Sequence, residues 1–223
     1  MKVEATLLFQ TPLNIGSGAQ HGTLADRAII KDRYGWPYLP ASAFKGWLRH
    51  AVEQVARKLA LSVCETHRQM CQDITHPCVV CSIFGSTWIR GKLPFADVEL
   101  SGPPELKAKL EALKRQRLRP QTESRYGVSI SRRRGVAQHQ LLYTTELFEP
   151  GVHLEFQTTL RAFPQKPLIR QEAALLAAGL RLLPAVGRGK SGGLGWVTAQ
   201  VAVYDEDRLL SDQELRATLA EGS

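Results

Sequence analysis

The order in which strand and helix patterns follow one another is the feature that most restricts the fold of this chain. Period-two alternation of apolar and polar residues, typical of β-strands, occurs at residues 2–9, 95–100, 152–160 and 196–204. Between them, apolar residues recur with a period near 3.6, first after Ser42, the expected helix N-cap, and again at about 167–183. Strand, helix, strand, strand, helix, strand is the order of a ferredoxin-like split βαβ unit, so we predict an α+β fold.

Two long segments interrupt this order, at about residues 61–93 and 101–149. The second contains a further short amphipathic helix pattern at about 105–118. Insertions of this length inside a compact domain are usually functional. Because the sequence has neither an internal repeat nor an interdomain linker, we predict that residues 1–223 form a single domain with two insertions.

The composition excludes several classes of protein. Of the 223 residues, 43% are hydrophobic, which is enough to bury a core and argues against a disordered tail or a fibrous repeat. No apolar run approaches the roughly 20 residues that span a bilayer. The first four residues, Met-Lys-Val-Glu, do not begin the hydrophobic region of a signal peptide. We therefore expect a soluble, cytoplasmic protein with no membrane partner.

Positive charge is concentrated in one segment. The net charge is +8, and eight basic residues between positions 114 and 134 are opposed only by Glu123. These basic residues are Lys114, Arg115, Arg117, Arg119, Arg125, Arg132, Arg133 and Arg134. The guanidinium group pairs with phosphates and stacks on bases, so the cluster favours a nucleic-acid partner over a solvated loop without a ligand.

Two other places have the chemistry of phosphate binding. Lys45 lies in the first turn of the helix after Ser42, where the helix dipole disfavours a cation, and Arg49 follows one turn later; a bound anion would resolve this conflict. A glycine-rich loop at residues 187–195 has five glycines together with Arg188 and Lys190. Its spacing is neither that of a Walker A loop nor that of a Rossmann fingerprint. Its amides and cations would still cradle a phosphate chain, whereas the alternative is a flexible connection.

All four cysteines, Cys64, Cys71, Cys78 and Cys81, fall within 18 residues. In an intracellular chain such a cluster indicates a metal site before a disulfide. The Cys78–Cys81 pair has the spacing of a zinc knuckle, and Cys64 and Cys71, or one of them with His67 or His76, would complete a tetrahedral Zn²⁺ site. We favour four thiolates over three thiolates and an imidazole. A structural zinc ion would supply folding energy to an insertion that is poor in apolar residues, whereas the alternative is four unliganded thiols.

Four stretches, in this order, carry a resemblance to a known family: residues 11–18, residues 37–49, the stretch from Arg132 to residue 151, and the glycine-rich loop. The set resembles the RAMP superfamily of CRISPR-associated proteins, most of all the backbone (seventh-group) subunit of type III effector complexes. This resemblance implies a ferredoxin-like (RRM-like) palm with a β-hairpin thumb near residues 127–144. It also implies a zinc-binding insertion that ends in a sequence similar to residues 78–85.

The resemblance further implies that copies of the subunit stack along a guide (CRISPR) RNA with other subunits, and that each thumb displaces a base of the duplex with a target RNA. The palm would hold the sugar-phosphate backbone of the guide through Ser42, Lys45, Arg49, Arg188, Gly189 and Lys190. Changes at Arg132, Arg133 and Arg134 would affect target engagement or thumb docking. Contacts to the backbone do not read sequence, so base pairing would provide specificity.

A catalytic residue is implied by the same resemblance. In family members that cut RNA, a loop aspartate lies six residues before a second aspartate, and Asp26 and Asp32 have this spacing, with Ala28 in place of a usual proline. We therefore predict that the chain is an endoribonuclease that depends on a divalent cation such as Mg²⁺ or Mn²⁺. Asp26 would be its catalytic residue, and His21 is a candidate to assist it. The alternatives are a non-catalytic scaffold that binds guide RNA and an enzyme that processes the guide precursor.

Overall fold

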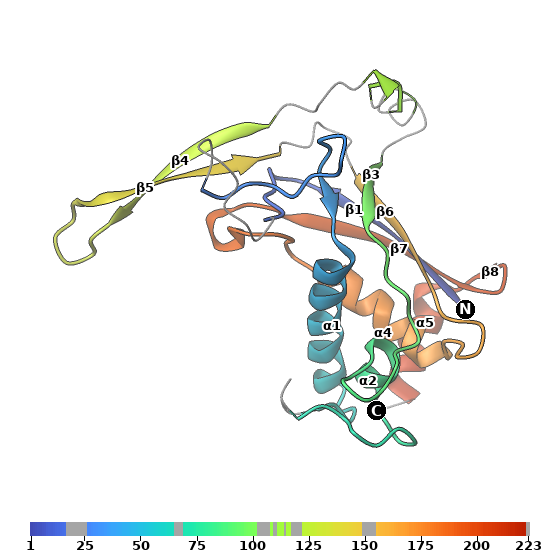
Figure 1. Ribbon diagram of the computed structural model, residues 1–223. Coiled ribbons are helices and arrows are strands. Elements are labelled where there is room, and N and C mark those ends of the chain that lie inside the picture. The colour runs from blue at the N-terminus through green and yellow to red at the C-terminus, as the bar shows by residue number, and fades with distance from the viewer. Residues whose placement is uncertain are drawn as a thin grey trace.

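The computed structural model describes residues 1–16, 26–64, 69–101, 108, 111–113, 115–116, 122–148 and 155–221 (Figure 1). Its strands are β1 (Lys2–Phe9), β2 (Tyr38–Leu39), β3 (Val98–Ser101), β4 (Glu123–Ile130), β5 (Ala137–Leu147), β6 (Glu155–Arg161), β7 (Val197–Asp205) and β8 (Arg208–Leu209). Its helices are α1 (Ala41–Lys58), α2 (Val79–Phe84), α4 (Arg170–Arg181), α5 (Asp212–Glu221) and the short 3₁₀ helix η1 (Lys190–Gly192).

The main sheet has the strand order β2-β3-β6-β1-β7-β8, and all of its paired neighbours are antiparallel. Its four inner strands, β3, β6, β1 and β7, follow one another in space as the strands of a ferredoxin-like unit do, with α1 and α4 as the two crossover helices. The predicted α+β fold and its element order are therefore confirmed.

The core lies between the sheet and the helices on one of its faces (Figure 1). In β1, Val3, Ala5 and Leu7 are buried, whereas the residues that alternate with them are half-buried on the other face. Burial of a valine or leucine side chain contributes about 1.5–3 kcal/mol, so this alternation fixes the register of the central strand. At Gly179 of α4 an added Cβ would lie 2.6 Å from Val52 Cγ2 of α1, so the close contact between these helices depends on glycine.

The start of α1 differs from the prediction. The N-cap is Pro40, which has an extended backbone and no side chain able to cap, so the expectation that Ser42 is the N-cap is wrong. Instead, Asp97 accepts a hydrogen bond from the Ala41 amide at 2.8 Å through Oδ1. A carboxylate from a distant part of the chain thus satisfies the first amide of the helix.

A two-stranded hairpin of β4 and β5 projects away from the main sheet (Figure 1). Its tip, residues 131–136, contains the exposed Arg132, Arg133 and Arg134 and turns at Gly135, where φ is +65°. The predicted hairpin is thereby confirmed, and we call it the thumb. The helix predicted at about 105–118 lies largely outside the described residues.

The insertion at residues 61–93, which we call the metal insertion, is anchored in the core. Val80, Ile83 and Phe84 of α2 are buried, and Lys92 Nζ lies 2.8 Å from both carboxylate oxygens of the buried Glu172 in α4. No helix in the described part of the chain is both long and apolar enough to cross a membrane. The organisation as one domain stays a prediction.

Candidate functional site

The four cysteines of the metal insertion converge. Their sulfur atoms all lie within 4.8 Å of one another, and Cys64 Sγ lies 3.4 Å from Cys71 Sγ, 3.8 Å from Cys78 Sγ and 3.6 Å from Cys81 Sγ. A tetrahedron with zinc–sulfur bonds of about 2.3 Å has sulfur–sulfur edges of about 3.8 Å. The spacing of the four sulfurs is therefore close to that of a tetrahedral zinc site.

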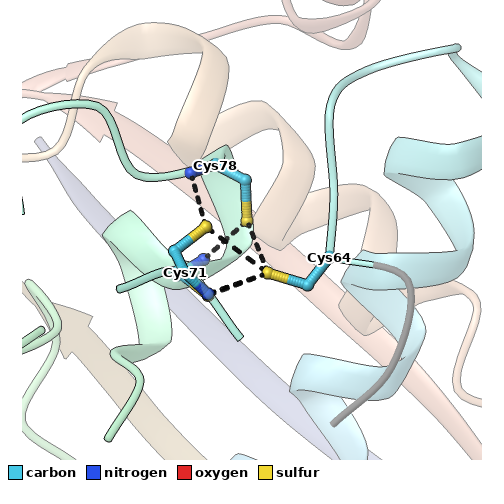
Figure 2. A group of neighbouring side chains, drawn as sticks. Cys64, Cys71 and Cys78 are labelled. Atoms are coloured by element: carbon cyan, nitrogen blue, oxygen red, sulfur yellow. Dashed lines mark hydrogen bonds between the residues drawn. The ribbon is translucent and has the colours of Figure 1, made fainter. Parts of the chain in front are cut away.

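Histidine is not needed to complete this set. The His76 side chain is exposed and lies 3.4 Å from Asp73, outside the cysteine cluster, and His67 lies outside the described residues. Figure 2 shows the sulfurs of Cys64, Cys71 and Cys78 turned toward one another. The predicted ligands Cys64, Cys71, Cys78 and Cys81 are therefore brought together, in agreement with the preference for four thiolates.

Backbone amides of the metal insertion point at the sulfurs. Cys71 N donates to Cys64 Sγ at 3.2 Å, Cys78 N to Cys71 Sγ at 3.3 Å and Cys81 N to Cys78 Sγ at 3.4 Å. The bond from the Cys78 amide lowers the pKa of Cys71, whereas burial raises the pKa of Cys64 and Cys78. A metal ion would displace the protons that burial retains on these thiols.

Each of the two predicted phosphate-binding segments has a lysine near the first two turns of α1. Lys190 of η1 holds its Nζ 5.9 Å from the centre of the Trp47 ring, and Lys45 Nζ lies 6.0 Å from the centre of the Phe95 ring. Neither lysine forms an ion pair with a residue that the structure describes. Two lysines from distant parts of the sequence therefore lie near the N-terminal half of α1, Lys190 beside Trp47 and Lys45 beside Phe95.

A pocket of about 440 Å³ opens beside Lys45. Its lining includes three cationic side chains, Lys45, Arg49 and Arg90, and no carboxylate. The exposed Arg90 guanidinium lies 4.4 Å from the centre of the Phe163 ring, which also lines the pocket. This combination of cations and an aromatic surface suits an anionic group with planar parts, as a nucleotide has.

Arg49 differs from Lys45 in having internal partners. Its Nε lies 3.0 Å from Glu53, its Nη1 donates to the Gly85 carbonyl at 2.6 Å, and its side chain is only 13% exposed. Its Nη2 lies 3.5 Å from Cys81 Sγ. Lys45 is therefore better placed than Arg49 to contact a ligand in solution.

The glycine-rich loop is docked on residues 11–16. The Arg188 amide donates to the Asn14 carbonyl at 2.8 Å. The Arg188 side chain lies over Gly16, where an added Cβ would be 2.5 Å from Arg188 Nε. Gly187 has φ +93°, and a Cβ there would lie 2.5 Å from the Asn14 oxygen. These contacts fix the position of the loop, on which Arg188, Gly189 and Lys190 are exposed. The loop is therefore not the flexible connection that the sequence left as an alternative.

Asp26 lies at the base of the thumb. Its Oδ2 accepts a hydrogen bond from the Thr144 amide at 2.7 Å, and the side chain is exposed. Arg27 continues this pairing, because its amide donates to Thr144 O at 3.1 Å and its guanidinium lies 4.2 Å from the centre of the Tyr143 ring. Asp32 has another role, since its Oδ1 accepts the amides of residues 34 and 36. His21 lies outside the described residues.

Two side chains that the sequence did not single out hold this region together. The buried Asn14 donates through Nδ2 to the carbonyls of Arg27, at 3.0 Å, and Glu146, at 2.7 Å. The Glu146 carboxylate accepts bonds from Lys31, the Ile29 amide and Thr122. Burial opposes ionisation of Glu146, but these donors outweigh it and hold its pKa below the ordinary value. Only the tertiary contacts reveal these roles.

Comparisons with known proteins agree with this architecture. The family model described as the RAMP superfamily matches residues 6–198, and the chain therefore belongs to the RAMP superfamily. No curated protein matches the sequence.

Two solved structures share the fold. One is a chain in the cryo-EM structure of the type III-B Cmr-beta bound to cognate target RNA, with a TM-score of 0.59 and 13% identity over 90% of this chain and 97% of that one. The other is a chain in the type III-B Cmr-beta cryo-EM structure of the apo state, with a TM-score of 0.58 and 14% identity over 95% of this chain and 98% of that one. The likeness extends over nearly the whole of each chain.

Proposed function

We propose that this RAMP protein is a guide-RNA-binding backbone subunit of a type III CRISPR effector complex. The observation that carries the proposal is that Lys45 of α1, and Lys190 of the glycine-rich loop beside Trp47 of the same helix, form no ion pair with a described residue. The fold shared with chains of a type III-B Cmr-beta structure bound to target RNA supports it. Copies of this chain and other subunits would be its protein partners, in the cytoplasm.

The guide would be bound through its sugar-phosphate backbone. Ser42 is exposed in the first turn of α1, beside Lys45, and Arg188, Gly189 and Lys190 are exposed on the glycine-rich loop. Cations of this kind neutralise phosphates, and amides donate hydrogen bonds to them, without reading bases. Base pairing would then select the target RNA, and Arg132, Arg133 and Arg134 at the thumb tip would contact the duplex or a neighbouring subunit.

We also propose that Asp26 takes part in target cleavage. Its Oδ2 is anchored by the Thr144 amide, and Oδ1 has no partner among the described residues, so one oxygen remains for a proton or a cation. A divalent cation such as Mg²⁺ or Mn²⁺, when bound, would stabilise charge on the phosphate. Asp26 would assist transfer of the 2′-hydroxyl proton, and the thumb beside it would help to align that hydroxyl with the leaving oxygen.

One assay distinguishes the three candidate activities. The complex reconstituted with a guide should cut a matched target RNA at several evenly spaced sites in the presence of Mg²⁺. Cutting only the guide precursor would support a processing enzyme, whereas guide binding without any cutting would support a scaffold. A mismatched target of equal length serves as the control for guide dependence.

For the metal insertion, we propose a structural Zn²⁺ held by Cys64, Cys71, Cys78 and Cys81. Sulfur spacing near that of a zinc tetrahedron and three amide-to-sulfur hydrogen bonds support this assignment. The purified, reduced chain should contain about one zinc ion, as measured by elemental analysis. Protein that is free of metal after purification without chelator would contradict it.

A further inference from the structure

Arg49 links α1 to the cysteine cluster. It extends from the middle of α1 into the metal insertion, where Nη2 lies 3.5 Å from Cys81 Sγ and 3.8 Å from Met70 Sδ. Cys81 itself is fully buried. A guanidinium group therefore lies in contact with a sulfur that the metal site would use.

The orientation of this guanidinium is fixed by its other partners. Glu53, one turn further along α1, receives Nε at 3.0 Å, and the Gly85 carbonyl receives Nη1 at 2.6 Å. Gly85 has φ +87°, and an added Cβ would lie 2.8 Å from Gly91 N, so this carbonyl is presented by a turn that requires glycine. With two of its nitrogens held in this way, the planar fork directs Nη2 toward sulfur.

The charge of the metal centre explains why a cation belongs there. Four thiolates around one Zn²⁺ leave a formal charge of about −2. The three amide-to-sulfur hydrogen bonds bring dipoles but no net charge. In a partly buried site an uncompensated charge is costly, and a guanidinium at hydrogen-bond distance from one sulfur offsets part of it.

We infer that Arg49 is a positioning residue of the metal centre, which holds the Cys81 thiolate and compensates the negative charge of the zinc-bound cluster. Its proposed action is therefore on the metal insertion. The inference rests on the proposed zinc site and is independent of the proposed RNA-binding role.

The test measures zinc affinity of the full chain without RNA, by competition with a chromogenic chelator. Arg49→Met should weaken zinc binding about 10- to 100-fold, the range found when a group that orients a metal ligand is removed. Arg49→Lys should fall between the wild type and Arg49→Met, since it keeps the charge but not the fork. Lys45→Met is the matched control: it removes a cation from the same helix and pocket and should leave zinc affinity unchanged.

Two results would overturn the inference. One is zinc affinity of Arg49→Met within about twofold of the wild type, and the other is an equal loss in Lys45→Met. If Arg49→Met does not fold, Arg49→Gln decides the question, because it is also neutral but retains a polar group; a wild-type affinity in that variant overturns the inference. As no RNA is present, neither result bears on guide binding.

Discussion

At the scale of single residues, Asp26 has a structural partner that its place in the sequence does not reveal. The Thr144 amide donates to its carboxylate, so an alanine there would remove both the charge and an anchor of the thumb base. Asparagine retains an oxygen acceptor for that amide and removes only the charge. The isosteric variant therefore separates chemistry from structure.

We expect Asp26→Asn to lower target cleavage by about 10²-fold or more, with melting temperature and guide binding unchanged, because the amide neither carries charge nor accepts the proton. Single-turnover cleavage of a matched target measures the effect. Asp32→Asn is the control, and we expect it to retain cleavage, since Asp32 Oδ1 caps the turn at residues 34 and 36. An Asp26→Asn complex that cuts at the wild-type rate would remove Asp26 from the mechanism.

The second prediction concerns Lys45. Lys45→Gln should weaken guide binding by a similar factor for unrelated guide sequences, and should lower the slope of log affinity against log salt by about one, because one phosphate contact is lost. Filter binding at several salt concentrations measures both. Lys58→Gln removes an exposed cation from the opposite end of α1 and should leave the slope unchanged. A loss restricted to some guide sequences would indicate base recognition instead.

The third prediction concerns the buried pair of Lys92 and Glu172. The Glu172 side chain is 3% exposed and the Lys92 side chain 19% exposed, so Glu172→Ala leaves a largely buried ammonium without its counter-charge. We expect the free energy of unfolding to fall by about 3–5 kcal/mol, as measured by chemical denaturation. A Lys92→Met, Glu172→Leu double variant should recover much of the loss. A single variant as stable as the wild type would show that the pair does not anchor the metal insertion.

At the scale of elements, the attachment of the thumb should depend on pH through Glu146. The pKa of this carboxyl is lower in the folded chain than in the unfolded one, so its ionised form stabilises the fold. That contribution is present above the ordinary glutamate pKa of about 4.3 and is lost as pH falls through the lower, folded value.

We therefore expect the protection factor of the Ile29 amide, which donates to Glu146, to fall as pH falls below about 4. The protection factor compares the observed exchange rate with that of an unstructured chain at the same pH, so it corrects for the pH dependence of exchange itself. Hydrogen exchange followed by NMR measures this protection. Glu146→Gln should lower protection at neutral pH and remove its dependence on acid. Equal protection in both proteins across this range would contradict the assigned role.

The sequence-based predictions were accurate where the contacts join residues close in sequence, and they failed where the contacts join distant segments. The inner strands β3, β6, β1 and β7 and the helices α1 and α4 depend on periodicity and turn residues that lie close together in the chain, and they were predicted. The thumb followed from the resemblance to the RAMP superfamily, whereas α2, α5, β2 and β8 were not predicted. The cysteine cluster was predicted because its ligands span only 18 residues. The cap of α1 by Asp97 and the attachment of Arg49 to the metal insertion depend on contacts between distant segments, so sequence patterns misassigned Ser42 and did not reveal the partners of Arg49.

At the scale of the whole molecule, two parts of the chain meet through α1. Its first turn carries the proposed guide-binding surface, and Arg49, one turn further, contacts the metal insertion. Removing the metal should therefore loosen the metal insertion first, because its cysteines would lose the ion that offsets their burial, while the sheet core persists.

Hydrogen exchange with and without a zinc chelator measures this fifth prediction. Protection should fall at the described residues of the metal insertion and remain in β1 and β7. Cys78→Ser should reproduce this loss of protection without chelator. Ser129→Ala on the thumb is the control variant, and its protection should not change. Uniform loss of protection across the sheet would contradict the separate stability of the metal insertion.

The central claim is that this chain is a repeated subunit along a guide RNA, and native mass spectrometry of the purified ribonucleoprotein tests it most directly. The complex should be assembled on guides of two lengths. We predict several copies of the chain on the shorter guide and additional copies on the longer one, because backbone contacts repeat along the RNA whatever its sequence. A single copy of the chain on both guides would contradict this repeated arrangement.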